Sequence, residues 1–388
     1  MTTLRTTLYA IIAATFVGAF GAAPAQAQAL GAGIETEARQ ALLMDDTTGT
    51  VLLAKNADEP MHPSSMSKLM TVYMVFEKLA KGELKLDDQF GVSERAWRQG
   101  GSKMFVQVGS RVNVDDLLKG VIVQSGNDAC IVLAEGLAGS EGAFADAMTR
   151  RARELGLTNS VFKNSTGWPD PQHLMTARDL AVLSRRIIHD FPQYYHYFGQ
   201  IDFTYNNIKQ GNRNPLLYKN LGVDGLKTGH TDEGGYGLTA SAKRGDRRLI
   251  LVVNGLTSMN ERSREPERLL DWGFREFDNY ALFKAGDKVD EADVWLGDQP
   301  KVPLVLEHNL VLTLPKAARK DLKAKLVYDG PVPAPIKQGM AIGHIEVSAP
   351  GMETVQVPLV AAADVGRLGF TGRLAAAFNY LVWGPTRR

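Results

Sequence analysis

The amino-acid sequence predicts a mixed α/β domain with an antiparallel sheet flanked by helices, followed by a small all-β domain and a terminal amphipathic helix. Three observations predict this order: apolar residues at helical spacing after Ser65, alternating and β-branched runs over 222–254, and short strand-like runs beyond Phe283. The chain has 388 residues, of which 44% are hydrophobic and 22% charged, so it is long enough for two ordered domains.

Residues 1–27 are interpreted as a secretory signal peptide. Arg5 supplies a basic start, an apolar run extends from Leu8 to Ala23, and a small-x-small cleavage site follows at 25–27. An uncleaved membrane anchor is the alternative, which the short, Ala/Gly-rich character of the run disfavours. We therefore expect an exported protein.

Composition argues against several classes of function. The net charge of +1 gives no electrostatic reason to expect a nucleic-acid partner. Cys130 is the single cysteine, so no intrachain disulfide can form. The seven histidines lack metal-ligand spacing, and no Walker or Rossmann glycine pattern is found. We expect neither a metal nor a cofactor.

Residues 28–284 have the mixed α/β pattern. Short apolar runs at 41–44 and 51–54 flank a turn-forming segment, which predicts a β-hairpin. A helix is expected to begin near Ser64, and the apolar positions that continue to Phe76 predict that it is buried. Its methionines are interpreted as core residues.

Ser65 and Lys68 are a candidate nucleophile and base. Residues three apart on a helix share a face, and its first turn holds unpaired N–H groups and the positive end of the dipole. Serine needs a neighbouring base, and lysine can act as one only when it is neutral. Burial or a second cation lowers a lysine pKa in that direction. The pattern is loose, however, and recurs at Ser160 and Lys163.

A second polar pair lies where the helical stretch between Asn113 and Ala138 is interrupted at 124–128. The interruption places the side chains of Ser125 and Asn127 on a tight turn. In isolation, turn and cap chemistry accounts for both residues. The same Ser-x-Asn spacing also recurs at 258–260.

The alternating runs over 222–254 predict neighbouring antiparallel strands. They contain Lys227-Thr228-Gly229, a pattern rarer by chance than the other two. Gly229 within a strand would allow a substrate backbone to approach closely. An exposed edge strand that ends in a turn is the alternative interpretation.

The three patterns together are more specific than any one of them. In order, 65–68, 125–127 and 227–229 match the Ser-x-x-Lys, Ser-x-Asn and Lys-Thr-Gly signature of class A β-lactamases and penicillin-binding proteins. With its Ser-Gly-Asn variant, Cys130 and the segment 270–274, the sequence closely resembles the serine-type D-alanyl-D-alanine carboxypeptidases, the low-molecular-mass penicillin-binding proteins. The resemblance covers nearly the whole mature chain and implies a serine β-lactamase/transpeptidase-like fold for 28–284.

The resemblance implies a role for each motif residue. Ser65 would attack the carbonyl between the two terminal D-alanines, Lys68 would take its proton, and Ser125 would relay a proton to the leaving amine. Asn127 would hydrogen-bond the substrate amide. Lys227 would keep Lys68 deprotonated by like-charge repulsion.

Further residues would bind the substrate's ends. Thr228 would face the terminal carboxylate, and the backbone N–H groups of Ser65 and His230 would form the oxyanion hole. Arg262 and Arg213 stand where the family has arginines near the carboxylate site, which a guanidinium can bind with two hydrogen bonds. The expected partners are the peptidoglycan stem pentapeptide and β-lactam antibiotics, which would acylate the same serine.

Two further regions complete the prediction. Five strand-like runs predict an all-β domain over 285–364, which the resemblance implies lifts the catalytic domain off the membrane. In 365–388, Phe370, Leu374 and Phe378 repeat at helical spacing beside arginines. This amphipathic helix is expected to lie on the inner-membrane surface, which would make the protein peripheral on the periplasmic face. Packing on a protein partner or on its own domain is the alternative.

Other activities remain open from the sequence. A class A β-lactamase would add a Glu-x-x-Leu-Asn loop, which is absent between Asn127 and Lys227. A D,D-endopeptidase or transpeptidase would use the same residues on another bond or acceptor. A peptidoglycan-binding module without activity would be expected to lack Ser65 or Lys68, and both are present.

Overall fold

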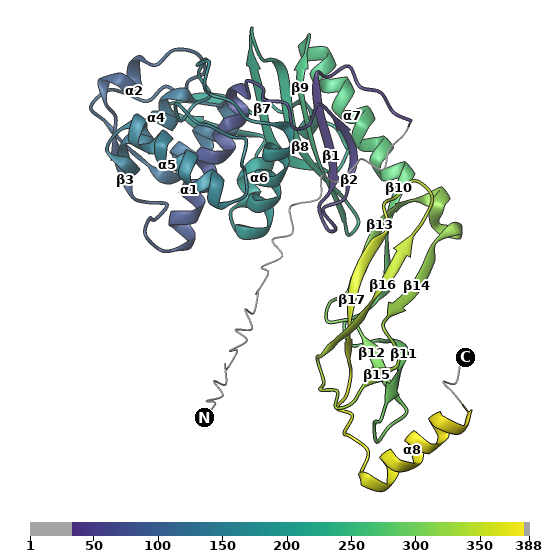
Figure 1. Cartoon of the computed structure of the whole chain (residues 1–388). Coiled ribbons are helices and arrows are strands. Elements are labelled where there is room, and N and C mark those ends of the chain that lie inside the picture. Colours follow the sequence, from purple (N-terminus) through teal and green to yellow (C-terminus); the bar gives the residue numbers. More distant parts are fainter. Residues whose placement is uncertain (1–32, 384–388) are drawn as a thin grey trace, which may run out of the picture.

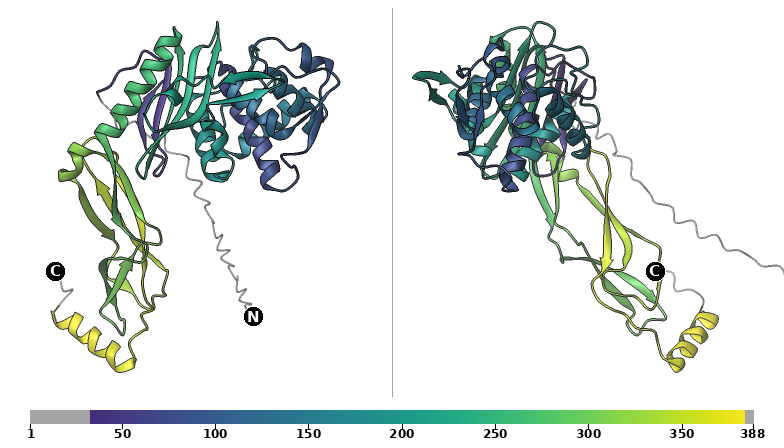
Figure 2. Two further views of the ribbon diagram at one scale, coloured as in Figure 1. Left: turned by 180° about the vertical axis from the view of Figure 1, so that it is seen from behind. Right: turned by 90° about the vertical axis from the view of Figure 1, so that its left-hand side faces the viewer.

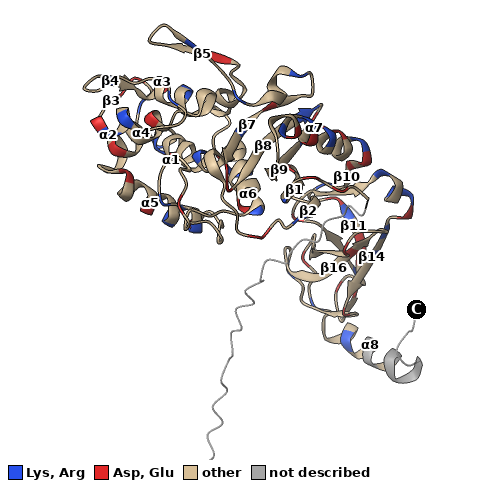
Figure 3. Ribbon diagram, turned by 90° about the horizontal axis from the view of Figure 1, so that it is seen from above, with Lys and Arg blue, Asp and Glu red and all other residues tan. Residues whose placement is uncertain are grey.

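The computed structural model describes residues 33–383. Figure 1 shows a larger part built of helices around a sheet, a narrow β-rich part that extends away from it, and a helix at the far end. The predicted signal peptide lies outside the described residues. Figure 3 shows basic and acidic residues interspersed along the ribbon of both parts, which agrees with the net charge of +1.

The larger part is organised by a five-stranded sheet in which all neighbours are antiparallel. The predicted hairpin forms one edge, and the predicted strands over 222–254 form the rest, so both predictions are confirmed. In spatial order the strands are β2 (Val51–Lys55), β1 (Gln40–Asp45), β9 (Arg247–Leu256), β8 (Gly235–Arg244) and β7 (Val223–Thr231).

Helices cover both faces of this sheet. Along β9, Ile250 and Val252 join the core shared with α1 (Lys68–Ala80) and α6 (Ala177–Asp190). The alternating residues of the same strand pack instead against α7 (Met259–Glu276). Because side chains of a strand alternate between faces, one strand supplies two separate hydrophobic cores.

Beyond the edge strand β7 lies a mainly helical region. Its small hairpins and short helices connect longer helices, of which α4 and α5 contact α1. Its elements are β3 (Gln89–Gly91), α2 (Glu94–Arg98), β4 (Arg111–Asn113), α3 (Val114–Lys119), the π-helix η2 (Gly120–Gln124), α4 (Asn127–Ala138), α5 (Glu141–Glu154), η3 (Tyr195–Gly199), β5 (Asp202–Tyr205), β6 (Ile208–Gly211) and η4 (Pro215–Tyr218).

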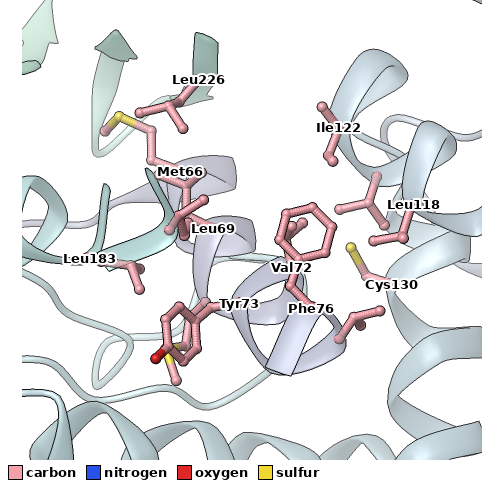
Figure 4. Packing of buried hydrophobic residues seen from close by; sticks show 14 of the residues in the cluster. Met66, Leu69, Val72, Tyr73, Phe76, Leu118, Ile122, Cys130, Leu183 and Leu226 are labelled. Atoms are coloured by element: carbon pink, nitrogen blue, oxygen red, sulfur yellow. The ribbon is translucent and has the colours of Figure 1, made fainter. Parts of the chain in front are cut away.

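Helix α1 runs through the middle of this region and is buried on most sides. Figure 4 shows Leu69, Val72 and Phe76 of α1 among side chains from the surrounding elements, including Cys130 of α4 and Leu226 of β7. Each such apolar side chain contributes roughly 1.5–3 kcal/mol through burial. The predicted buried helix is confirmed, and this packing fixes the helix whose first turn carries the candidate base.

The β-rich part contains a two-stranded and a six-stranded sheet around a separate core. The five predicted strand-like runs all lie in strands. The sequence pattern does not predict β10, β11 or β15; in β11, four of the eight residues are charged, which obscures the alternation. The predicted boundary between 284 and 285 follows β10, which pairs with β13, so the predicted limits leave this strand of the β-rich part with the first domain. The elements are β10 (Phe277–Phe283), β11 (Lys288–Trp295), β12 (Lys301–Val305), β13 (Leu310–Pro315), η5 (Lys316–Asp321), β14 (Lys323–Tyr328), β15 (Val332–Pro333), β16 (Ala341–Ser348) and β17 (Val355–Ala361).

A buried carboxylate joins the two parts. Asp45 at the end of β1 is 0% exposed and accepts hydrogen bonds from Arg247 Nε at 2.8 Å and Asn279 Nδ2 at 3.1 Å. Asn279 belongs to β10, and its Oδ1 accepts from Thr313 Oγ1 of the paired strand β13 at 2.8 Å. These bonds connect the β-rich part directly to the central sheet.

Helix α8 (Phe370–Trp383) lies at the end of the β-rich part, away from the central sheet in both views of Figure 2. The side chains of Phe370, Leu374 and Phe378 are 72%, 56% and 66% exposed. The amphipathic helix is therefore present, and these three residues do not pack on its own domain. Within residues 33–383, no helix has the length and apolar character needed to cross a membrane.

Candidate active site

The turn before α1 presents the candidate nucleophile. Residues Ser64–Ser67 form a single 3₁₀ turn, η1, and the α-helix proper begins at Lys68. Ser67 Oγ donates to the Ser64 carbonyl at 3.0 Å, and Ser64 has a positive φ of 50°. The sequence predicted one continuous helix from Ser64; the local bond to the Ser64 carbonyl instead favours the tighter turn. Ser65 is half-buried at its centre.

Lys68 is enclosed by three acceptors. Its Nζ lies 2.8 Å from Ser65 Oγ, 2.8 Å from Asn127 Oδ1 and 2.5 Å from the Thr166 carbonyl oxygen. The side chain is 0% exposed. Burial lowers the pKa of Lys68 to about 8, and the positive charge of Arg213 also lowers it. A lysine amine with this pKa is neutral far more often than one in water.

Lys227 lies on β7 and is also buried, with 2% exposure. Burial lowers the pKa of Lys227 well below its usual value, and the charge of Lys68 lowers it further. Repulsion by Lys227 is the predicted cause of a neutral Lys68. In the structure burial is the larger cause for both groups, and their repulsion disfavours a state with both charged.

The Ser-Gly-Asn turn lies between η2 and α4, as predicted. Ser125 adopts a left-handed conformation with φ 66° and is 3% exposed. Asn127 does not cap α4; its Oδ1 accepts from Lys68, and its Nδ2 donates to the Gly100 carbonyl at 2.9 Å. The interpretation of Asn127 as a simple cap is therefore wrong, because its amide links the base to the 100–106 loop.

Strand β7 is an edge strand that closes one side of the site. Ser64 Oγ lies 2.9 Å from Thr231 Oγ1, which ties η1 to this strand. A Cβ on Gly229 would stand 2.8 Å from the Pro63 carbonyl oxygen and 3.2 Å from Ser64 Cβ. The close approach at Gly229 is thus to the turn that holds Ser65, and Thr228 beside it is 4% exposed. The close approach of a substrate backbone at Gly229 stays a prediction.

Two arginines near the buried lysines form no ion pair with a carboxylate among residues 33–383. Arg262 on α7 is 8% exposed and donates only a long bond of 3.4 Å to the Gly229 carbonyl, while its Nε has no partner. Arg213 is exposed, and its charge lowers the pKa values of Lys68 and Lys227. The arrangement favours an anion.

His230 follows Gly229 on the same strand. Its side chain is exposed, and its ring centroid lies 3.9 Å from that of Tyr236. The imidazole therefore makes an aromatic contact along the sheet edge, whereas the backbone of His230 stays within β7. Across the described residues no cluster of His, Cys, Asp and Glu has the geometry of a metal site.

Sequence reasoning missed the segment 164–168. Its Thr166 carbonyl contacts the Lys68 amine, and Gly167 has a φ of 76° and packs against the Ser64 carbonyl without room for a Cβ. The glycine after a run of small polar residues was the available signal, but such runs are common in loops. The contact joins residues about a hundred positions apart, which no local pattern reveals.

Comparison with known proteins identifies the family. A family model described as D-alanyl-D-alanine carboxypeptidase, peptidase S11, matches residues 24–258, more than half of the chain. This chain belongs to that family. A second model, described as the C-terminal domain of penicillin-binding protein 5, matches residues 277–367. Peptidase S11 enzymes are hydrolases, and the predicted fold and family are confirmed.

Relatives span nearly the same length. The D-alanyl-D-alanine carboxypeptidase DacC of Escherichia coli is 42% identical over 346 residues, covering 87% of this chain and 86% of its own. The structure of penicillin-binding protein 5 from Haemophilus influenzae has a TM-score of 0.79 at 37% identity, covering 87% of this chain and 100% of its own. An ampicillin-bound structure of Listeria monocytogenes penicillin-binding protein D2 has a TM-score of 0.58 at 29% identity, covering 63% of this chain and 100% of its own.

Proposed function

We propose that this S11 enzyme is a serine D-alanyl-D-alanine carboxypeptidase that removes the terminal D-alanine from peptidoglycan pentapeptides through an acyl-enzyme on Ser65. The observation that carries the proposal is the buried amine of Lys68, 2.8 Å from the Ser65 hydroxyl, with a pKa lowered to about 8. A buried lysine beside a serine can take its proton when the amine is neutral. The reaction contributes to peptidoglycan remodelling and cell shape.

Acylation begins with the neutral amine. Its two N–H groups donate to Asn127 Oδ1 and the Thr166 carbonyl, and its lone pair accepts the Ser65 proton. Ser65 Oγ then bonds to the carbonyl carbon between the two D-alanines. The C–N bond breaks as the leaving amine receives a proton by way of Ser125. Water later attacks the ester and restores Ser65, releasing a peptide that ends in a new carboxylate.

Charge stabilisation comes from the strand side of the site. The backbone N–H groups of Ser65 and His230 bind the developing oxyanion, for which pre-oriented donors are the most effective stabilisers. The substrate's terminal carboxylate is bound beside Thr228 by the arginines. Arg262 lacks a carboxylate partner among the described residues and donates from β7's side of the site, which supports this role.

The substrate carboxylate also favours the reactive protonation state. An anion close to Lys227 raises the pKa of that group and favours its charged form. Because burial disfavours two charged lysines side by side, a charged Lys227 keeps the proton off Lys68. Asn127, through its remaining N–H, donates to the substrate amide. Binding and activation of the base are thus coupled.

β-Lactams are proposed to acylate the same Ser65. They present a carboxylate and a strained amide carbonyl, which the cationic site and the oxyanion donors can bind together. The structural relative from Listeria is described in an ampicillin-bound form, which supports the proposal for this chain. The slow release of the resulting ester makes penicillin a covalent label for the nucleophile.

The β-rich part and α8 are proposed to hold the enzyme at the periplasmic face of the inner membrane. The exposed Phe370, Leu374 and Phe378 form an apolar face of the kind that inserts at a lipid surface. Removing 369–388 should release the processed protein from membranes with its activity intact. The cut begins at 369 because residues before it pair with the β-rich part: Val365 with Ile336, and Arg367 with Gly297. Continued sedimentation of the truncated protein with membranes would contradict the anchor.

Labelled penicillin and a peptide ending in D-Ala-D-Ala together test the reaction. The purified protein should carry label on Ser65 and release free D-alanine, whereas Ser65→Ala should do neither. Ser160→Ala is the matched control and should retain both. Label without D-alanine release would favour transpeptidation or endopeptidase cleavage. Label retained in Ser65→Ala would place the nucleophile elsewhere.

A further inference from the structure

The loop that presents the Thr166 carbonyl is organised by one side chain. Asn164 Oδ1 accepts hydrogen bonds from three consecutive backbone N–H groups, those of Thr166 at 3.1 Å, Gly167 at 2.8 Å and Trp168 at 3.0 Å. It also accepts from the Thr166 hydroxyl at 3.1 Å, and Asn164 Nδ2 donates to the Trp168 carbonyl at 3.0 Å. An asparagine side chain that gathers successive N–H groups fixes the direction of the carbonyls between them.

Two buried side chains anchor the same loop from beneath. Glu141, 5% exposed, accepts from the backbone N–H of Ser165 at 3.0 Å and from its hydroxyl at 2.8 Å. Thr71 Oγ1 donates to the Ser165 carbonyl at 2.7 Å. Thr71 lies on α1 one turn after Lys68, so the loop is bound to the helix that carries the base. The position of the loop relative to the Lys68 amine is therefore fixed by α1.

The loop ends in the shortest contact of the amine, at 2.5 Å between Thr166 O and Lys68 Nζ. A neutral amine has two N–H groups and one lone pair. When Thr166 O and Asn127 Oδ1 accept both N–H groups, the lone pair is left pointing at the third neighbour, Ser65 Oγ. The direction of the base is thus set by two acceptors, one of them a backbone carbonyl.

We propose that Asn164 is a positioning residue for this reaction: it holds the Thr166 carbonyl against Lys68 and thereby aims the lone pair of the amine at Ser65. The proposal rests on the proposed function, in which Lys68 is the base. Asn164 contacts neither Lys68 nor Ser65 directly. Its effect passes through the loop, so it should alter the rate and pH dependence of acylation rather than the identity of the nucleophile.

Two effects follow from releasing the carbonyl. The amine would lose an acceptor and spend less time aimed at Ser65, which lowers the limiting rate of acylation. A carbonyl that accepts from an ammonium also favours its charged form, so the loss lowers the pKa of Lys68. A fall in limiting rate together with a shift of the acid limb to lower pH is a combination that general destabilisation does not produce.

The test is the rate of acylation by labelled penicillin across pH for Asn164→Ala. We expect a limiting rate lower by on the order of 10- to 100-fold. We also expect the acid limb, the part of the pH–rate profile in which acylation rises as Lys68 loses its proton, to lie at lower pH. Asn164→Asp keeps the acceptor oxygen and should recover most of the rate, with its limb at higher pH because a carboxylate favours the charged lysine. Asn113→Ala, which removes a helix cap remote from the loop, is the control and should leave rate and limb unchanged.

The outcomes separate this proposal from the proposed function. If the unaltered protein is not acylated, the assignment of Ser65 and Lys68 is wrong. If it is acylated and Asn164→Ala matches it in rate and limb, the positioning role is overturned. Should Asn164→Ala fail to fold, Thr166→Val removes the hydroxyl that donates to Asn164 and accepts from the Trp168 N–H, and it leaves the Asn164 side chain in place. A smaller rate loss with the same downward shift supports the proposal, and an unchanged profile overturns it.

Discussion

Two Ser-x-x-Lys patterns lie in the larger part of this protein in opposite environments. At the first, Lys68 is fully buried and its Nζ contacts Ser65 Oγ at 2.8 Å. At the second, Lys163 is exposed, and Ser160 Oγ donates instead to Asp179 Oδ2 at 2.7 Å. The spacing brings serine and lysine together only where a helical turn begins and the surroundings exclude water from the amine.

The two Ser-x-Asn patterns differ in the same way. Ser258 caps α7, its Oγ accepting from the Glu261 N–H at 3.1 Å. Asn127 instead accepts from the buried Lys68 amine. A short polar pattern therefore serves local structure by default, and it can serve catalysis when tertiary packing delivers a partner from elsewhere in the chain.

The largest expected difference separates the two lysines. Lys68→Ala should slow acylation of Ser65 by roughly 10²- to 10⁴-fold, the usual contribution of a positioned general base. Lys163→Ala should have no effect, because its side chain is exposed. Stopped-flow acylation by a fluorescent penicillin measures both. Comparable losses in the two variants would show that burial does not distinguish the patterns.

Alanine substitutions of the two serines of the Ser-x-Asn patterns should affect different properties, the reaction rate for Ser125 and the stability for Ser258. Ser125→Ala should slow acylation or product release by on the order of 10²-fold, as expected for loss of a proton relay. Ser258→Ala should instead lower the free energy of unfolding by about 1 kcal/mol through loss of a helix cap, with turnover unchanged. Urea titration and D-alanine release distinguish the two. A normal turnover rate for Ser125→Ala would remove it from the mechanism.

A smaller effect concerns pH. Because only neutral Lys68 can accept the proton, acylation should increase with pH through an apparent pKa of about 8. Below that limb, the rate should fall about tenfold for each pH unit. Lys163→Ala should show the same limb. A rate independent of pH between 6 and 9 would indicate that Lys68 is neutral throughout or is not the base.

The smallest effect on activity is expected at Ser160, in the second Ser-x-x-Lys pattern. Ser160→Ala removes a donor from buried Asp179, whose pKa burial already raises. We expect a loss of about 1–3 kcal/mol in the free energy of unfolding and unchanged acylation of the folded protein. Ser184→Ala, which removes a hydroxyl bonded only within its own helix, should lose less. Reduced acylation in fully folded Ser160→Ala would connect the second pattern to catalysis.

Much of the fold follows from local pattern. The hairpin, the buried α1, the interrupted helix around Ser125 and the strands over 222–254 all depend on hydrophobic periodicity, which is a property of consecutive residues. The strand β11 was not predicted because half of its residues are charged, and the single turn at Ser64–Ser67 depends on one side-chain bond.

The sequence by itself determined the family, through three ordered patterns, and it identified Ser65, Lys68 and Asn127 as residues of one site. Only the tertiary structure decided how they meet. The lowered pKa of Lys68 arises from burial among side chains of several elements, and its third acceptor comes from the loop at 164–168. The burial of Lys68 and the orientation of its amine depend on packing between distant segments, so no local pattern can encode them.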